Sequence, residues 1–171
     1  MKPTVSVIIV FRNEEMHLDK ALQSIVVQTY PKELTEVILV DGDSTDNSWS
    51  IAQNASQMLE ETGYRVKLLK NPMKTLAPGW NIALRASDSD CVCRIDCHGT
   101  IPPDYIEKGI GNLINGKAEG IAAVGGVLEN VGKGFWGKIF CDFYSCKFGV
   151  GNSPFRTAKT GIFFSDTAAM G

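Results

Sequence analysis

Asp96 and His98 stand two residues apart in the segment CVCRIDCHGTI (residues 91–101), where an apolar run gives way to polar residues. Carboxylate oxygens and imidazole nitrogens are ligands that hard or borderline divalent cations accept. Because the run is typical of a buried strand, we expect both side chains beyond its carboxyl end. There they could hold a cation that in turn neutralises a diphosphate.

Two other apolar runs are followed by polar side chains in the same way. Phe11 ends the run VSVIIVF, with Asn13 and Glu14 just after it, and Asp41 follows the run VILV. A carboxylate at the position of Asp41 could accept a hydrogen bond from a nucleobase, and Glu14 could bind ribose hydroxyls. Local roles are the alternative: Asp41 could make a turn or helix cap, and Glu14 could begin a helix.

Strand-like and helix-like apolar patterns alternate along the chain. Apolar residues recurring at i, i+3, i+4 and i+7 predict helices, and short runs rich in β-branched residues predict strands. The expected strands are residues 5–11, 37–40, 65–69, 91–95 and 121–127, and the expected helices lie within 18–26, 51–59, 78–84, 103–114 and 135–144.

This alternation predicts right-handed βαβ units and a mostly parallel α/β sheet flanked by helices. Ligands of such sheets bind beyond the carboxyl ends of the strands. We therefore expect one domain over residues 1–171, with the polar residues that follow the strands gathered at one edge. They are Asn13, Glu14, Asp41, Asp96 and His98, together with the apolar Phe11 that ends the first strand.

Composition narrows the class of protein. The chain has 171 residues, of which 44% are hydrophobic and 21% charged. Its net charge of -2 creates no electrostatic field strong enough to argue for nucleic-acid binding. No apolar run has the length of a membrane span, and residues 12–15 are unlike a secretory cleavage site. Five cysteines and no signal predict reduced thiols in the cytoplasm, with docking at the inner membrane face left open.

Two other classes of site are weighed against this interpretation. A nicotinamide or phosphate-loop enzyme needs a glycine-rich turn after the first strand, and residues 11–14 are FRNE instead. Cys91, Cys93, Cys97 and His98 could be imagined as a zinc site. A C-x-C pair on a strand is more typical of buried thiols, and the C-x₂-C turn is missing.

The segments SVIIVFRNEE, VDGDSTDNS, NPMKTLAPGWNIALRAS and RIDCHGTIPPDY together resemble the inverting family-2 glycosyltransferases with the GT-A fold. The RIDCH form, with FGVGNSPFR and FSDTAAMG further on, is similar to the succinoglycan-biosynthesis branch, which builds bacterial exopolysaccharides. The resemblance covers nearly the whole chain, and its motifs occur in the family's order.

The resemblance implies a nucleotide-diphosphate sugar donor, usually a uridine one, with Mn²⁺ or Mg²⁺ on its diphosphate. It implies that Asp41 contacts the base, that Glu14 lies near the nucleoside, and that Phe11, Asn13 and Asp96 also bind the nucleotide sugar. Asp96 matches the first acid of the family's D-x-D motif. His98 replaces the second acid, normally the direct metal ligand, and imidazole can still bind such an ion.

The family's general base lies in a later segment than this sequence reaches, so the catalytic base is unassigned, and the chain is expected to be truncated. Asp166 is a weak candidate because it is the only acid near the end. The alternative function is a non-catalytic nucleotide-sugar-binding module, or a remnant that lacks the base.

The family also implies a glycan or lipid-linked acceptor. The aromatic stripe at residues 135–144 is expected to pack on the sheet, or else to lie along a membrane interface. Arg156 and Lys159 could meet acceptor phosphates. Lys74 and Arg85 could hold donor phosphates or be solvated helix charges. Arg94, two residues before Asp96, could make a structural ion pair or contact a ligand.

Overall fold

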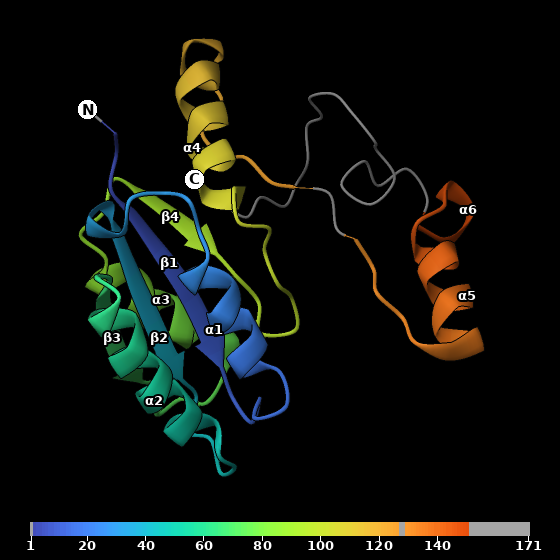
Figure 1. Cartoon of the computed structure of the whole chain (residues 1–171), viewed down its shortest axis with the longest axis horizontal. Coiled ribbons are helices and arrows are strands. Elements are labelled where there is room, and N and C mark those ends of the chain that lie inside the picture. The colour runs from blue at the N-terminus through green and yellow to red at the C-terminus, as the bar shows by residue number, and fades with distance from the viewer. Residues whose placement is uncertain (1, 127–128, 151–171) are drawn as a thin grey trace. The chain divides into compact units, whose positions relative to one another are not determined.

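The computed structural model describes residues 2–126 and 129–150 of the chain (Figure 1). These residues fall into two compact units whose boundary follows Ala122. The first unit contains the sheet and all of the pocket described below. The second contains two helices, within residues 134–144 and 147–150.

Four parallel strands form the sheet of the first unit, in the order β3-β2-β1-β4 (Figure 1). Their bounds are β1 (Val5–Phe11), β2 (Thr35–Asp41), β3 (Arg65–Lys70) and β4 (Cys91–Arg94). The parallel α/β architecture expected from the sequence is therefore confirmed, and β1 has the predicted bounds.

The predicted strand at residues 121–127 is wrong for its described part. Residues 121–126 form no strand, and Val124 makes only an isolated bridge. Residue 127 lies outside the described residues. Gly125 and Gly126 explain the difference, because glycine has no side chain to pack and the most backbone entropy to lose in a strand.

Six α-helices occur in the described ranges, four of them in the first unit and two in the second. They are α1 (Leu18–Val26), α2 (Ser48–Glu61), α3 (Leu76–Ala86), α4 (Tyr105–Gly116), α5 (Gly134–Tyr144) and α6 (Lys147–Val150). The helices predicted within 18–26, 51–59, 78–84, 103–114 and 135–144 are all present. None of those described is long and apolar enough to cross a bilayer.

Helices α1 and α2 cover one face of the sheet and α3 covers the other (Figure 1). The reason is the handedness of the crossovers. The chain moves outward from β1 to β2 and β3, then returns past β1 to β4, so a right-handed connection through α3 must use the opposite face. The reversal makes the gap between β1 and β4 the topological switch point of the sheet.

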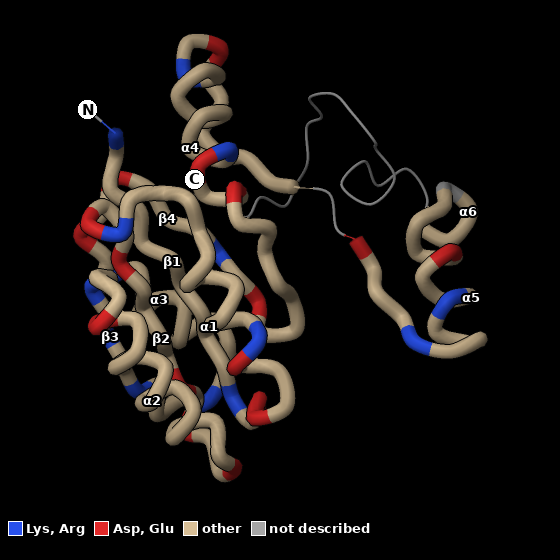
Figure 2. Tube along the Cα trace, viewed as in Figure 1, with Lys and Arg blue, Asp and Glu red and all other residues tan. Residues whose placement is uncertain are grey.

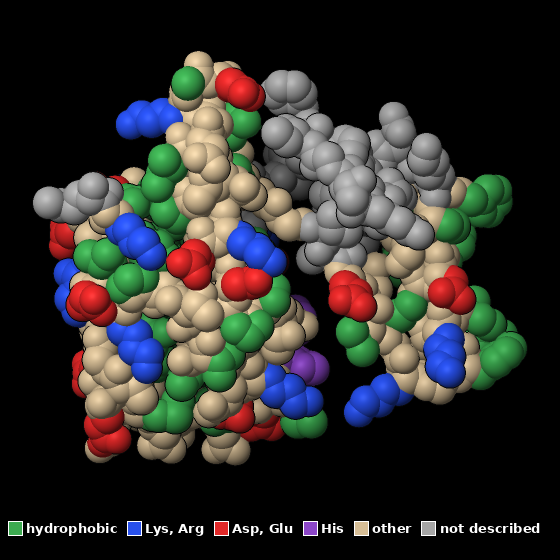
Figure 3. All heavy atoms as spheres, turned by 45° about the horizontal axis from the view of Figure 1, so that its top comes forward, with side chains coloured by type: hydrophobic (Ala, Val, Ile, Leu, Met, Phe, Trp, Pro, Cys, Tyr) green, Lys and Arg blue, Asp and Glu red, His purple; other side chains and the backbone are tan. Residues whose placement is uncertain are grey.

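Burial on both faces explains the composition of the central strands. Strand β1 has no charged residue (Figure 2), and Ile8, Ile38, Val40 and Ala83 form a core between the sheet and α3. Charged side chains of both signs are interspersed with apolar ones on the face drawn in Figure 3. Polar groups are thus left to the strand ends and the helix surfaces.

Gly79 is where α3 comes closest to the sheet. A Cβ added there would lie 2.5 Å from Cγ1 of Val10 and 3.2 Å from Nδ2 of Asn71. In contrast, a Cβ on Gly111, within α4, would meet nothing within 4 Å.

We therefore expect the same substitution to have opposite effects at the two glycines. Gly79→Ala should lower the free energy of unfolding by about 1–3 kcal/mol, because overpacking outweighs the gain in helix propensity. Gly111→Ala should raise it by up to about 1 kcal/mol. Urea denaturation followed by circular dichroism measures both, and a Gly79→Ala protein as stable as the wild type would contradict the close packing of α3.

Candidate functional site

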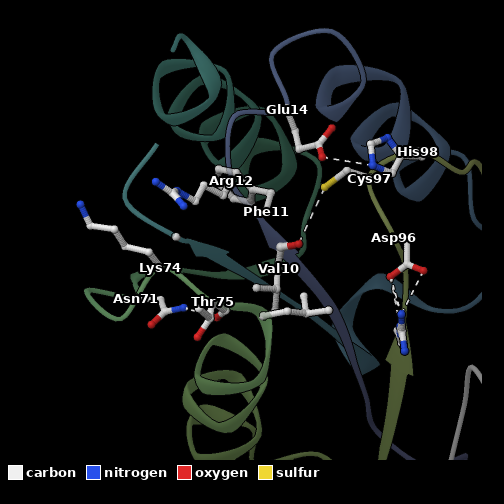
Figure 4. A pocket seen from close by; sticks show the side chains of 13 residues that line it. Val10, Phe11, Arg12, Glu14, Asn71, Lys74, Thr75, Asp96, Cys97 and His98 are labelled. Atoms are coloured by element: carbon white, nitrogen blue, oxygen red, sulfur yellow. Dashed lines mark hydrogen bonds and ion pairs between the residues drawn. The ribbon is translucent and has the colours of Figure 1, made fainter. Parts of the chain in front are cut away.

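A pocket of about 380 Å³ opens at the carboxyl edge of the sheet, at the switch point between β1 and β4 (Figure 4). Its walls come from the ends of β1 and β4, from the loop between β3 and α3, and from one residue after β2. The lining residues are Val10, Phe11, Arg12, Glu14, Gly42, Asn71, Lys74, Thr75, Leu76, Arg94, Asp96, Cys97 and His98.

The structure brings four of the six predicted site residues to this pocket. Phe11, Glu14, Asp96 and His98 line it (Figure 4), whereas Asn13 and Asp41 do not. Glu14 and His98 face each other, with Oε1 of Glu14 3.2 Å from Nε2 of His98. The carboxylate is mostly shielded, with 19% of the Glu14 side chain exposed, against 68% for His98.

Asp96 turns to a different partner. Its two oxygens accept hydrogen bonds from Nε and Nη2 of Arg94, at 3.0 and 3.1 Å (Figure 4). The ion pair weighed for Arg94 from the sequence is therefore present. Arg94 also lies over the ring of Trp80, 5.5 Å from its centroid. Asp96 and His98 thus share a pocket but bond separate groups in this structure.

Asp41 is fully buried at the end of β2, and both of its oxygens have partners. Oδ1 accepts from the backbone N–H and the hydroxyl of Ser44, at 3.1 and 2.5 Å, and Oδ2 accepts from Nζ of Lys70 at 2.6 Å. The turn role expected as an alternative for Asp41 is thus present. Nζ of Lys70 also lies 3.4 Å from the ring centroid of Trp49.

Sequence reasoning missed Lys70. The strand register pairs it directly with Asp41, so a correct alignment of the second and third strands could have indicated the contact.

Asn13 connects the loop after β1 to the loop after β2. Its Oδ1 accepts from the backbone N–H of Thr45 at 2.8 Å, and its own N–H donates to Oγ of Ser44 at 2.9 Å. Next to it, the N–H of Glu14 donates to Oγ of Ser48 at 2.7 Å. These bonds hold the two loops together as one rigid rim beside the pocket.

Backbone strain is concentrated at the same edge. Asn13, Asp43 and Lys74 have φ angles of 56°, 60° and 62°, and they are the non-glycine residues with positive φ in the described ranges. Each one follows the end of a different strand. Left-handed backbone costs energy for residues with a Cβ and is found more often at functional sites than elsewhere.

Positive charge in the pocket comes from Arg12, Lys74 and Arg94. Nζ of Lys74 lies 2.7 Å from Oδ2 of Asp43, and the hydrogen bond from Lys74 lowers the pKa of that carboxyl. Of the two basic residues proposed from the sequence for donor phosphates, Lys74 lines the pocket and Arg85 does not.

The cysteines considered for zinc are poor ligands in this fold. Cys93 and Cys97 are buried, and burial raises the pKa of each thiol to about 12. Metals bind the thiolate form, so the burial that disfavours ionisation works against zinc binding at these two thiols.

The roles expected from the sequence for several residues are not tested by the described part of the chain. Asp166, Arg156 and Lys159 lie outside the described residues. Helix α5 is present as predicted, and its aromatic side chains are exposed, with 73% for Phe135 and 69% for Trp136. Its packing on the sheet stays a prediction.

Comparison with known proteins gives a consistent set of relatives. The family model described as glycosyl transferase family 2 matches residues 6–164. The dolichyl N-acetyl-α-D-glucosaminyl phosphate 3-β-D-2,3-diacetamido-2,3-dideoxy-β-D-glucuronosyltransferase of Methanococcus voltae is 27% identical over 98% of this chain and 51% of its own length. The succinoglycan biosynthesis protein ExoA of Rhizobium meliloti is 30% identical over 87% of this chain and 43% of its own. The chain thus spans about half the length of these relatives.

Solved structures agree on the fold. The mannosyltransferase PcManGT of Pyrobaculum calidifontis, in complex with GDP-Man and Mn²⁺, matches 78% of this chain and 36% of its own at a TM-score of 0.63 and 25% identity. TarS 1-349 of S. aureus, in complex with UDP-GlcNAc, matches 77% and 36% at a TM-score of 0.63 and 20% identity. The fold is therefore that of the GT-A glycosyltransferases.

The pairing of Lys70 with Asp41 generates a stability prediction. Lys70→Met should lower the free energy of unfolding by about 1.5–3 kcal/mol, because it removes a hydrogen bond to a buried carboxylate. Lys74→Met is the matched control: it breaks a pair with the exposed Asp43, and should cost less than about 1 kcal/mol. Chemical denaturation compares the two, and equal losses would show that the burial of Asp41 does not matter.

Proposed function

The chain belongs to glycosyl transferase family 2, and we propose that it binds a nucleotide-diphosphate sugar, a uridine one, in the pocket between β1 and β4. The observation that carries the proposal is the convergence of Glu14, Lys74, Asp96 and His98, from loops after three strands, on one cavity. A cavity of about 380 Å³ is within the usual range for small-molecule sites. Both units are proposed to belong to one glycosyltransferase domain.

The structural relatives support this class of ligand. PcManGT was solved with GDP-Man and Mn²⁺, and TarS with UDP and with UDP-GlcNAc. Basic side chains on one wall of the pocket, Arg12 and Lys74, suit the negative charge of a diphosphate. Charge held within the pocket matters here because the net charge of the whole chain is only -2.

We propose that Mn²⁺ or Mg²⁺ is held with the donor by Asp96 and His98. Both are exposed side chains that offer oxygen and nitrogen to the same cavity, and this ligand set fits such an ion. Asp96 would exchange Arg94 for the ion, and the exchange is inexpensive because exposed ion pairs contribute at most about 1 kcal/mol. A bound cation would act as Lewis acid for the leaving diphosphate.

The nucleoside half of the donor is assigned to the rigid rim. Phe11, Asn13 and Glu14 would lie near the nucleoside, and Asp41 would select the base. Because both oxygens of Asp41 are engaged, a uracil N–H would reach it by replacing Lys70 as the donor to Oδ2. Lys70 is half exposed and can move, whereas the Ser44 bonds are part of a turn.

Transfer is proposed to proceed with inversion, by direct attack of an acceptor hydroxyl on the anomeric carbon. The acceptor would be a glycan or a lipid-linked saccharide in polysaccharide biosynthesis, met in the cytoplasm or at the inner membrane face. The name of the ExoA relative, a succinoglycan biosynthesis protein, supports this role. No general base is assigned among residues 2–126 and 129–150.

Calorimetry with UDP and GDP, each with and without Mn²⁺, tests the donor proposal. We expect UDP to bind more tightly than GDP and only when Mn²⁺ is present. Asp96→Asn should weaken Mn²⁺-dependent UDP binding at least about tenfold, or 1.4 kcal/mol. Glu60→Gln is the control, because it removes the same charge from an exposed position at the C-terminal end of α2, outside the pocket.

Three results would contradict parts of the proposal. Equal affinity for UDP and GDP would remove the uridine preference, and UDP binding that ignores Mn²⁺ or the Asp96 substitution would remove the cation. A second measurement, besides calorimetry, follows the release of UDP from UDP-sugars and tests for enzymatic activity. Donor binding with no release at any Mn²⁺ concentration would show a binding module instead of an enzyme.

A further inference from the structure

The two histidines of the chain lie together in the fold. His17 and His98 are far apart in the sequence, yet their ring centroids are 5.1 Å apart with the planes at 72°, and they appear next to each other on the surface in Figure 3. The Glu14 carboxylate completes the group. One ligand atom from each of Glu14, His17 and His98 lies within 4.8 Å of the others.

We propose that Glu14, His17 and His98 form a binding site for a late first-row divalent cation such as Zn²⁺, independent of any nucleotide. Asp96, which the proposed donor site uses, is not a member of this group. Its oxygens are held by Arg94, whereas His98 already contacts Glu14. His17, in turn, has no part in the proposed donor site. The two cation sites therefore share His98, and Glu14 also lines the donor pocket, so His17 is the ligand that distinguishes the second site.

The backbone places two of the ligands on one turn. The N–H groups of His17 and Leu18 donate to the carbonyl of Glu14 at 3.0 and 2.9 Å, so Glu14 and His17 are neighbours at the start of α1. The N–H of Glu14 is itself fixed by Ser48. His17 makes no side-chain capping bond to α1, which leaves its imidazole available as a ligand.

The third ligand is positioned by a separate turn after β4. The N–H of Gly99 donates to the carbonyl of Asp96 at 3.0 Å, which closes the turn that carries His98. The neighbouring Cys97 is buried, with 5% of its surface exposed, and anchors the turn to the core. The exposed imidazole of His98 therefore projects from a fixed base towards Glu14.

The distances suit a tetrahedral ion. Zinc binds nitrogen and oxygen at about 2.0–2.1 Å, so its ligand atoms lie about 3.3 Å apart in a tetrahedron. The 3.2 Å between Glu14 and His98 matches this spacing. Exposed His17 has only to turn towards them, and three protein ligands leave a fourth position open, as in zinc sites that bind water or substrate.

The ligand types give the selectivity. Two imidazoles favour Zn²⁺, Co²⁺ and Ni²⁺ over Mg²⁺ and Ca²⁺, which prefer all-oxygen sites. A plain surface pair between Glu14 and His98 would need no second histidine. The participation of His17 therefore distinguishes a cation site from a simple ion pair between Glu14 and His98.

One consequence rests on the proposed function. A cation bound by Glu14, His17 and His98 would take His98 from the ion proposed to accompany the donor diphosphate. Zn²⁺ is then expected to compete with Mn²⁺-dependent UDP binding.

Calorimetric titration of the full chain, without an affinity tag, with Zn²⁺ alone tests the site. We expect one Zn²⁺ per chain, with affinity reduced at least about tenfold in His17→Ala and in His98→Ala. Asp96→Asn, the matched control in the same pocket, should bind Zn²⁺ like the wild type. Thermal melts without metal verify that the variants are folded, and His17 is exposed, so its replacement leaves the core intact.

Cobalt absorption identifies the ligands directly. Co²⁺ should give a visible spectrum typical of nitrogen and oxygen ligation that is lost in His17→Ala. A thiolate charge-transfer band, unchanged Zn²⁺ affinity in His17→Ala, or no Zn²⁺ binding by the wild type would each overturn the inference.

UDP binding in the presence of Mn²⁺, measured on His17→Ala, separates this inference from the proposed function. His17 has no part in the proposed donor site, so UDP binding there should equal that of the wild type. Zn²⁺ binding without UDP binding would leave the metal site standing and remove the donor site. UDP binding without Zn²⁺ binding would do the reverse.

Discussion

Parallel pairing of the central strands is the constraint on which the rest of the structure depends. Strand β1 pairs with β2 on one side and with β4 on the other, and all three run in the same direction. Their carboxyl ends must therefore lie at one edge. Helices α1 and α3 occupy opposite faces, so no helix fills the space between β1 and β4 at that edge, and the pocket forms there.

Hydrogen bonds between loops turn this edge into a preformed surface. Asn13 is bonded to Ser44 and Thr45, Glu14 to Ser48, and Glu15 to Asn47, so the loops after β1 and β2 are tied at several points. The left-handed conformation of Asn13 persists because such contacts overdetermine it. The packing of the buried strands thus offsets the conformational cost of holding these polar groups in place.

Periodicity in the sequence predicted the four strands and the long helices because these elements bury regular apolar faces. It placed the start of β2 two residues late, since Thr35 and Glu36 look exposed. In the structure Glu36 is buried, and its carboxylate is paired with Lys67 at 2.8 Å and with the Ser6 hydroxyl. Burial of a charge depends on partners from other strands, and local sequence does not contain that information.

The site shows the same division. Motif order and strand ends were enough to place Glu14, Asp96 and His98 in one pocket. The contacts of Lys70 with Asp41 and of His17 with His98 depend on register and on how a helix meets a distant turn. The strand expected at residues 121–127 failed for a local reason, because two glycines weaken it. The sequence was therefore enough to identify the candidate site residues, whereas the partners of their side chains could be identified only from the fold.

The cross-bonding of the first two loops has a consequence for how this scaffold can change. Residues 12–15 and 43–48 form one interlocked block, so a substitution in either loop disturbs both. The segment at residues 71–75 bonds within itself through Asn71, Met73 and Thr75, and meets the block through the exposed ion pair of Lys74 with Asp43. Natural or engineered substitutions should therefore change the shape and charge of the pocket most readily in that segment, while residues 12–15 and 43–48 keep their conformation.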